Sequence, residues 1–248
     1  AGRMVHHLGA MGPGEDWVIA TLRDAGICPE HVQRPDGQVT GHAIILLDAR
    51  AENSIVIHPG ANRAICEDRL AQALSPIGAD DTLLIQNETN GQIAAARIGK
   101  AAGARVIYSA APFDLAAVGA VMPHVSVLAM NAGEAEALFA GFPGDLPVEG
   151  LLITRGADGA EYRDLTNGDI WRQPAFRVYP VDTTGAGDTF TGYFATALDR
   201  GDSIAEALRL ASAAAALQVT RQGAAQAIPT MEDVLEFLAE HAGLVAGA

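Results

Sequence analysis

The sequence has few cysteines, few basic residues and no long apolar run. Only Cys28 and Cys66 occur among 248 residues, so neither a disulfide framework nor a cysteine-based zinc site is expected, and a reducing compartment is the default. The 16 Lys and Arg residues against 30 Asp and Glu residues give a net charge of −14, which disfavours nucleic acids and anionic membranes as partners. No apolar run is long enough to cross a bilayer, and the first residues lack a signal-peptide core. We therefore expect a cytoplasmic protein without a nucleic-acid or membrane partner.

Two common phosphate-binding motifs are also absent. The pattern G-x-x-x-x-G-K-[ST] does not occur, and Gly185-Ala186-Gly187 lacks the third glycine that a dinucleotide-binding fingerprint requires. Any nucleotide must therefore be held in another way.

From residue 82 onward, short apolar runs alternate with segments of helical periodicity. The expected strands are 83–86, 105–109, 126–129 and 151–154, and the expected helices are 91–102, 115–121 and 132–140. This alternation predicts a parallel sheet with helices on both faces, and ligands of such sheets bind at the carboxyl ends of the strands. A further strand is expected at 176–178, before a glycine turn and a helix.

Two β-rich runs, 38–48 and 53–58, are joined by residues 49–52 in a pattern typical of a hairpin. We predict that residues 1–38 and 59–248 form the α/β domain and that residues 39–58 form the hairpin. An ordinary hairpin at a sheet edge would give the same pattern.

The segment from Asp182 to Gly192 combines a glycine turn with acids on both sides. At the start of a helix, the free N–H groups of Gly185, Ala186 and Gly187 would suit an anion. Asp188 would lie beside that anion, where its carboxylate could accept a proton from an attacking hydroxyl. The alternative is a tight turn followed by a favourable acid in the first helical turn.

This segment resembles the C-terminal signature of the ribokinase-like (PfkB) carbohydrate kinase family, and the similarity extends from Gly9 to Leu238. The resemblance implies a ribokinase-like (Rossmann-like) three-layer α/β/α sandwich with a small β-sheet lid. In the family, the lid at the position of residues 39–58 closes over the sugar and often makes the dimer contact. Family members open with a strand that carries a sugar-binding acid and with a Gly-Gly segment. Neither precedes Ala1, so we expect the family's opening segment to be missing.

The resemblance also assigns roles to individual residues. The implied roles are sugar binding by Glu88 and Asp188, ATP binding by Asn131, Thr154, Gly156 and Ser212, a water-mediated Mg²⁺ contact by Glu134, and binding of a monovalent cation such as K⁺ by Asp182, Thr184, Val219 and Gly223. Asn131 and Glu134 also have the spacing of a helix cap, and Glu88 could be a solvated loop acid. Ala227 replaces a hydroxyl residue that is common in the family, which weakens the case for the cation.

The function that the resemblance implies is an ATP-dependent sugar kinase. It would transfer the γ-phosphoryl group to the primary hydroxyl of D-ribose, giving ribose 5-phosphate, and it would act as a homodimer formed through the lid. Two alternatives remain open: a family kinase for 2-keto-3-deoxygluconate, fructose or a nucleoside such as adenosine, and a non-catalytic sugar-binding relative.

Overall fold

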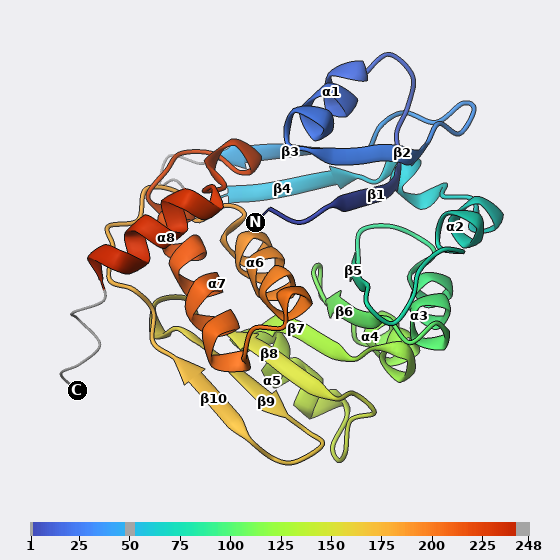
Figure 1. Cartoon of the computed structure of the whole chain (residues 1–248). Helices are drawn as coiled ribbons and strands as arrows, with labels where there is room; N and C mark the ends of the chain where they lie inside the picture. Colours follow the sequence, from blue (N-terminus) through green and yellow to red (C-terminus); the bar gives the residue numbers. More distant parts are fainter. Residues whose placement is uncertain (1, 48–52, 242–248) are drawn as a thin grey trace.

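The computed structural model describes residues 2–47 and 53–241. A six-stranded sheet in the order β10-β9-β8-β7-β6-β5 forms its centre (Figure 1). The strands are β5 (Thr82–Gln86), β6 (Arg105–Ser109), β7 (Val127–Asn131), β8 (Gly150–Thr154), β9 (Ala160–Asp164) and β10 (Ile170–Gln173). The predicted parallel pairing is confirmed for β5 to β8, whereas β9 and β10 add to the edge in antiparallel orientation.

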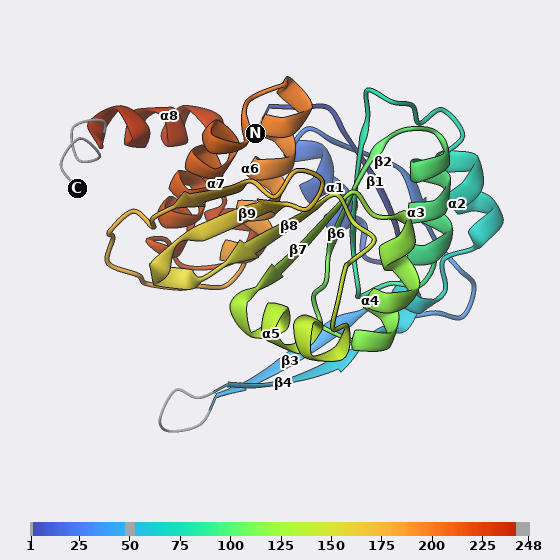
Figure 2. The ribbon, with the colours of Figure 1, turned by 90° about the horizontal axis from the view of Figure 1, so that it is seen from below.

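Helices cover both faces of this sheet, so the three-layer α/β/α prediction is confirmed (Figures 1 and 2). The helices are α1 (Asp16–Asp24), α2 (Glu67–Ala73), α3 (Gln92–Ala101), α4 (Leu115–Val121), α5 (Ala132–Gly141), α6 (Ala186–Arg200), α7 (Ile204–Val219) and α8 (Met231–Glu240). Side chains alternate between the two faces along β8: Leu151 and Ile153 pack in the same cluster as α4 and α5, whereas Leu152 packs with α6 and α7. In the described part of the chain, no helix has the length and apolar character that a membrane span requires.

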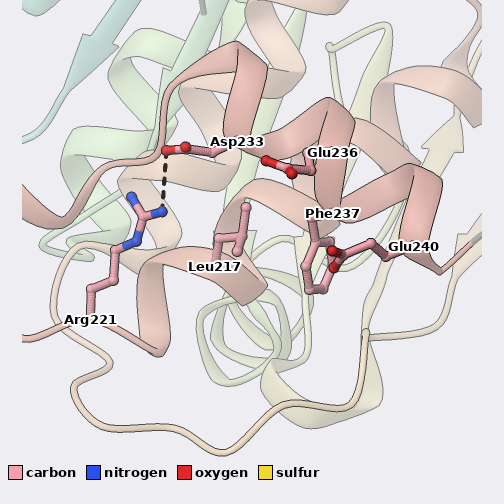
Figure 3. Close-up of a pocket in the computed structure, with 6 residues that line it drawn as sticks. All are labelled: Leu217, Arg221, Asp233, Glu236, Phe237 and Glu240. Carbon is pink, nitrogen blue, oxygen red and sulfur yellow. Dashed lines mark hydrogen bonds and ion pairs between the residues drawn. The ribbon is translucent and has the colours of Figure 1, made fainter.

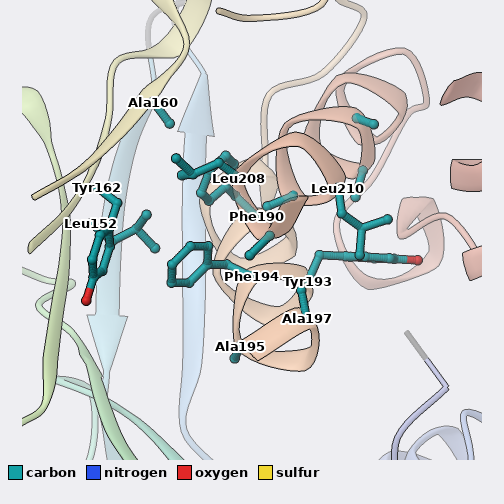
Figure 4. Close-up of a cluster of buried hydrophobic side chains, with 14 of the residues drawn as sticks. Leu152, Ala160, Tyr162, Phe190, Tyr193, Phe194, Ala195, Ala197, Leu208 and Leu210 are labelled. Atoms are coloured by element: carbon teal, nitrogen blue, oxygen red, sulfur yellow. The ribbon is translucent and has the colours of Figure 1, made fainter. Parts of the chain in front are cut away.

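The core between the sheet and helices α6 and α7 fixes the position of the glycine turn that precedes α6 (Figure 4). Phe194 and Leu208 are fully or almost fully buried there, and buried alanines such as Ala211 allow the two helices to pack closely. The hydroxyl of Tyr193 donates a hydrogen bond to the Pro229 carbonyl at 2.7 Å. Burial raises the pKa of Tyr193 to about 12, so this contact persists at neutral pH.

A pair of strands, β3 (His42–Leu47) and β4 (Asn53–His58), forms a separate antiparallel sheet that we call the lid. The predicted connecting turn at 49–52 lies outside the described residues. The base of the lid is held by Gly12, whose N–H donates to Thr40 Oγ1 at 2.9 Å. A Cβ at Gly12 would lie 2.7 Å from the Thr40 nitrogen, so the close approach of the two segments requires glycine.

A second small sheet pairs β1 (Val5–Ala10) with β2 (Ile27–Gln33) in parallel. The sequence pattern predicts a strand near β1 but none at β2, where a proline, an acid and a histidine interrupt the apolar run.

The predicted strand at 176–178 is wrong, because these residues form no strand and β10 ends before them. Phe176 instead packs edge-to-face on Phe237 of α8, with ring centroids 5.3 Å apart. Val178 is partly buried against the same core cluster. Their apolar alternation therefore reflects packing against the helical layer rather than strand pairing.

Candidate active site

A cavity of about 190 Å³ lies where the carboxyl ends of β6, β7 and β8 face the start of α6. This is the edge at which parallel α/β sheets bind ligands. The lining residues come from the ends of β6, β7 and β8, from the start of α5, and from the turn before α6 with the first turns of that helix: Ser109, Ala111, Ala129, Met130, Asn131, Glu134, Leu152, Thr154, Thr183, Gly185, Ala186, Gly187, Asp188 and Thr191. The cavity therefore brings together most residues of the predicted phosphate site.

The turn at residues 183–187, before α6, presents backbone N–H groups to this cavity, and we call it the anion-binding turn after the role predicted for it. Gly185 has φ of 75°, a left-handed conformation that favours glycine. Within the described residues, the N–H groups of Gly185, Gly187 and Asp188 have no hydrogen-bond acceptor. The N–H of Ala186, which we expected to be free, donates to the Thr183 carbonyl at 3.3 Å. Free donors at the positive end of a 15-residue helix suit an anion.

Asp188 lies in the first turn of α6, and its side chain is exposed to the cavity. Gln86, the last residue of β5, donates from Nε2 to Asp188 Oδ1 at 2.6 Å. This contact joins residues 102 positions apart, and Gln86 is not among the predicted site residues. The only signal in the sequence was its place at the end of a predicted strand.

Asn131 and Glu134 form a capping box at the start of α5. The Asn131 N–H donates to Glu134 Oε2 at 2.8 Å, and the Glu134 N–H donates to Asn131 Oδ1 at 2.9 Å. The capping alternative is therefore confirmed. Both residues also line the cavity, so the cap holds them beside the anion-binding turn.

Of the remaining residues predicted to bind sugar or ATP, Thr154 lines the cavity and three do not. Gly156 lies exposed in the turn after β8. Ser212 is buried in α7, with 6% of its surface exposed, and its Oγ has no partner among the described residues. Glu88 is exposed in the loop after β5, two residues beyond Gln86. The Arg63 guanidinium holds this loop by donating to the Thr89 carbonyl at 2.8 Å.

The strand end that carries Thr154 is tied to β9 and β10 by a buried carboxylate. Glu161 has 4% of its surface exposed and accepts hydrogen bonds from Arg155 at 2.9 Å, Arg163 at 2.7 Å and Arg172 at 3.3 Å. Burial raises the pKa of Glu161, but the hydrogen bonds and charges of Arg155 and Arg163 outweigh that effect and lower it. Glu161 therefore stays ionised and fixes Arg155 next to Thr154.

The four residues predicted to bind a monovalent cation lie together behind the anion-binding turn. Asp182 accepts hydrogen bonds from the N–H groups of Thr184 at 2.9 Å and Gly223 at 3.0 Å. The Val219 carbonyl accepts from the N–H groups of Val181 at 2.7 Å and Asp182 at 3.2 Å. The backbone and side-chain hydrogen bonds from Thr184, followed by that from Gly223, lower the pKa of Asp182. The carboxylate therefore joins two loops as an ionised group.

A larger hollow of about 290 Å³ lies elsewhere, between the end of α7 and α8 (Figure 3). Three acids line it, and one of them, Asp233, pairs with Arg221 at 3.1 Å. Glu236 and Glu240 are without a partner in the view, so the lining repels a polyanion such as a nucleotide. None of the predicted site residues lines this hollow.

Comparison with known proteins gives consistent matches over most of the chain. Residues 1–231 match the pfkB family carbohydrate kinase model. A ribokinase from Haemophilus influenzae is 36% identical over 248 residues, covering 92% of this chain and 80% of the relative. The crystal structure of a ribokinase from Thermotoga maritima has a TM-score of 0.81 and 30% identity, covering 94% of this chain and 81% of that chain. A structure of an Arabidopsis thaliana ribokinase complexed with ribose and ATP has a TM-score of 0.82 and 27% identity, covering 95% of this chain and 82% of that chain.

The fold and these matches define the protein as a phosphotransferase. More narrowly, the chain belongs to the pfkB family of carbohydrate kinases and is a ribokinase-family sugar kinase.

Proposed function

We propose that the protein transfers the γ-phosphoryl group of ATP to the primary hydroxyl of D-ribose, forming ADP and ribose 5-phosphate. The observation that carries this proposal is the cavity in which the free N–H groups of Gly185 and Gly187 lie beside the Asp188 carboxylate. Backbone donors next to a potential base are the arrangement that phosphoryl transfer to a hydroxyl requires.

In the proposed reaction, the sugar hydroxyl oxygen attacks the γ-phosphorus, and the bond from that phosphorus to the bridging oxygen breaks. The hydroxyl proton passes to the Asp188 carboxylate, and ADP leaves with the bridging oxygen. The N–H groups at the start of α6 stabilise negative charge on the phosphoryl oxygens. Gln86 keeps one oxygen of Asp188 fixed, which leaves the other for the proton.

Mg²⁺ fits the oxygen donors on the wall of the cavity that Asn131 and Glu134 form at the start of α5. Glu134 uses Oε2 for the capping box, so its second carboxylate oxygen is available for a metal-bound water, and Mg²⁺ prefers oxygen ligands of this kind. When bound, Mg²⁺ would neutralise part of the negative charge on the phosphates of ATP. Asn131 and Thr154 line the same wall and are the residues that we propose to contact the nucleotide. Gly156 and Ser212 do not line the cavity. Their contact with the parts of ATP that lie farther from the γ-phosphate stays a prediction.

The choice of ribose as the substrate rests on the names of the relatives. We propose that the sugar binds between the lid and the end of β5. The sequence at that place offers Glu88 as a hydrogen-bond acceptor for a sugar hydroxyl. We further propose that two chains associate through their lids and that the enzyme acts in the cytoplasm.

The test is release of ADP by the whole chain with MgATP and each of a panel of acceptors: ribose, 2-deoxyribose, fructose, 2-keto-3-deoxygluconate and adenosine. We expect the highest kcat/KM with ribose and no turnover after EDTA removes the divalent ion. A higher kcat/KM with another acceptor would reassign the substrate. No turnover with any acceptor, from a protein that still binds ATP, would favour the non-catalytic alternative.

A further inference from the structure

A buried glutamine occupies the centre of the loop cluster behind the anion-binding turn. Gln218, near the end of α7, has none of its surface exposed. Its Nε2 lies 3.0 Å from the carbonyl oxygens of Thr184 and Ala224 and 3.4 Å from that of Gly223. The side-chain amide therefore gathers three backbone carbonyls from two loops around one nitrogen.

The chemistry of the neighbours fixes the orientation of this amide. An NH₂ group carries two donor protons, whereas the carbonyl end of the side chain only accepts. Turning the amide over would direct Oε1 at three other acceptors, so the orientation with Nε2 among the carbonyls is the favourable one. The Oε1 atom has no hydrogen-bond partner in the described part of the chain, which leaves the donor end as the group that holds Gln218 in place.

These residues do not fit a monovalent cation as they are arranged. Carbonyl oxygens together with a carboxylate are ligands that a hard cation prefers. Here, however, the point that the three carbonyls share is filled by the Gln218 nitrogen. The other two predicted ligands are also engaged, because Asp182 and the Val219 carbonyl each accept two backbone N–H groups.

We propose that the Gln218 side-chain amide takes the place of a monovalent cation in this kinase, so that the anion-binding turn is held without K⁺. The partly positive NH₂ group draws the Thr184 carbonyl toward the loop at 223–224, and Thr184 directly precedes Gly185. Gln218 is thus a positioning residue, because it contacts the backbone beside the anion hole and no reacting group.

The experiment compares the melting temperature Tm of the whole chain in KCl and in choline chloride at equal ionic strength. The variants are wild type, Gln218→Ala and Gln72→Ala, the last being the same change at an exposed position of α2. We expect wild type and Gln72→Ala to have the same Tm in both salts. Gln218→Ala should melt about 5 °C lower in choline chloride, because three buried carbonyls lose a donor, and KCl should restore part of that loss by binding among them.

A wild-type Tm that rises in KCl but not in choline chloride would overturn the proposal, because the ion would then displace the amide. A Gln218→Ala variant that does not respond to KCl would overturn it as well, since the carbonyls would not form a cation site in its absence. Gln218→Ser, which also leaves space for an ion among the carbonyls, replaces the alanine variant if the latter does not fold. The wild-type comparison needs no variant.

A kinetic measurement adds a readout that depends on the turn itself. We expect the kcat/KM of wild type to be equal in the two salts and that of Gln218→Ala to rise several-fold from choline chloride to KCl. The kcat/KM measurement rests on the proposed function, whereas the Tm measurement does not. An inactive wild type with the expected Tm pattern would therefore count against the proposed substrate and leave the role of Gln218 supported. A wild-type kcat/KM that rises with KCl would contradict that role.

Discussion

At the scale of single residues, the pairing of Gln86 with Asp188 is the contact closest to the proposed chemistry. The Asp188 carboxylate is exposed and lies at the start of a helix, where it could rotate among several positions. The 2.6 Å hydrogen bond from Gln86 Nε2 selects one of them. Because proton transfer requires a base within hydrogen-bond reach of the hydroxyl, this selection should raise the rate of the chemical step.

Replacing Gln86 with alanine should therefore lower kcat by roughly 10-fold to 100-fold, an estimate based on the cost of misplacing a reacting group. The KM for ATP should change little, because Gln86 does not line the cavity. Steady-state kinetics with varied ATP and ribose measures both quantities, with Gln72→Ala as the control. An unchanged kcat, or a loss that parallels a lower Tm, would contradict the positioning role.

At the scale of secondary-structure elements, the lid has uncovered apolar side chains. Ile44 and Val56 are paired in register across β3 and β4, and they are 54% and 56% exposed. The neighbouring residue Ile57 points to the opposite face of the strand and is 58% exposed. A two-stranded sheet that is exposed on both faces is marginally stable by itself, so a second surface should cover at least one of them.

The substitution Val56→Asp should convert the proposed dimer into a monomer, because association through the lid would desolvate the added charge. Multi-angle light scattering of wild type and variant measures the molar mass directly. Leu235→Asp, at a position of α8 that is 55% exposed, is the matched control and should leave the dimer intact. A wild type that is monomeric at micromolar concentration would contradict association through the lid.

The sequence predicts the helices and the parallel strands best, because apolar periodicity and capping residues are local features of the chain. The capping boxes at Asn131, Ser203 and Thr230 mark the starts of α5, α7 and α8, and each follows from side chains three residues apart. The strand β2 was missed because its pairing with β1 compensates for a poor apolar pattern. The strand predicted at 176–178 is wrong for the opposite reason. The apolar spacing there is that of a strand, but it reflects packing on α8.

At the scale of the whole molecule, an acidic protein with a net charge of −14 must bind a polyanion. We propose that backbone N–H groups at the start of α6 meet this requirement, while the acidic hollow at α8 shares no lining residue with the cavity. The composition of the predicted site could be read from the sequence because Asp182 to Asp188 are contiguous. The contacts of Gln86 and Gln218 could not, because they join residues 102 and 34 positions apart that only the tertiary fold brings together.

The central claim is that the backbone of the turn holds the phosphate while Asp188 accepts the proton. It is tested most directly by Asp188→Asn, which keeps the size of the side chain and its place in the first turn of α6. ATP affinity, measured by isothermal titration, should be nearly unchanged. In contrast, kcat with MgATP and ribose should fall by about 10²-fold to 10⁴-fold, the range typical of a lost general base. An Asn variant that turns over at the wild-type rate would contradict the account.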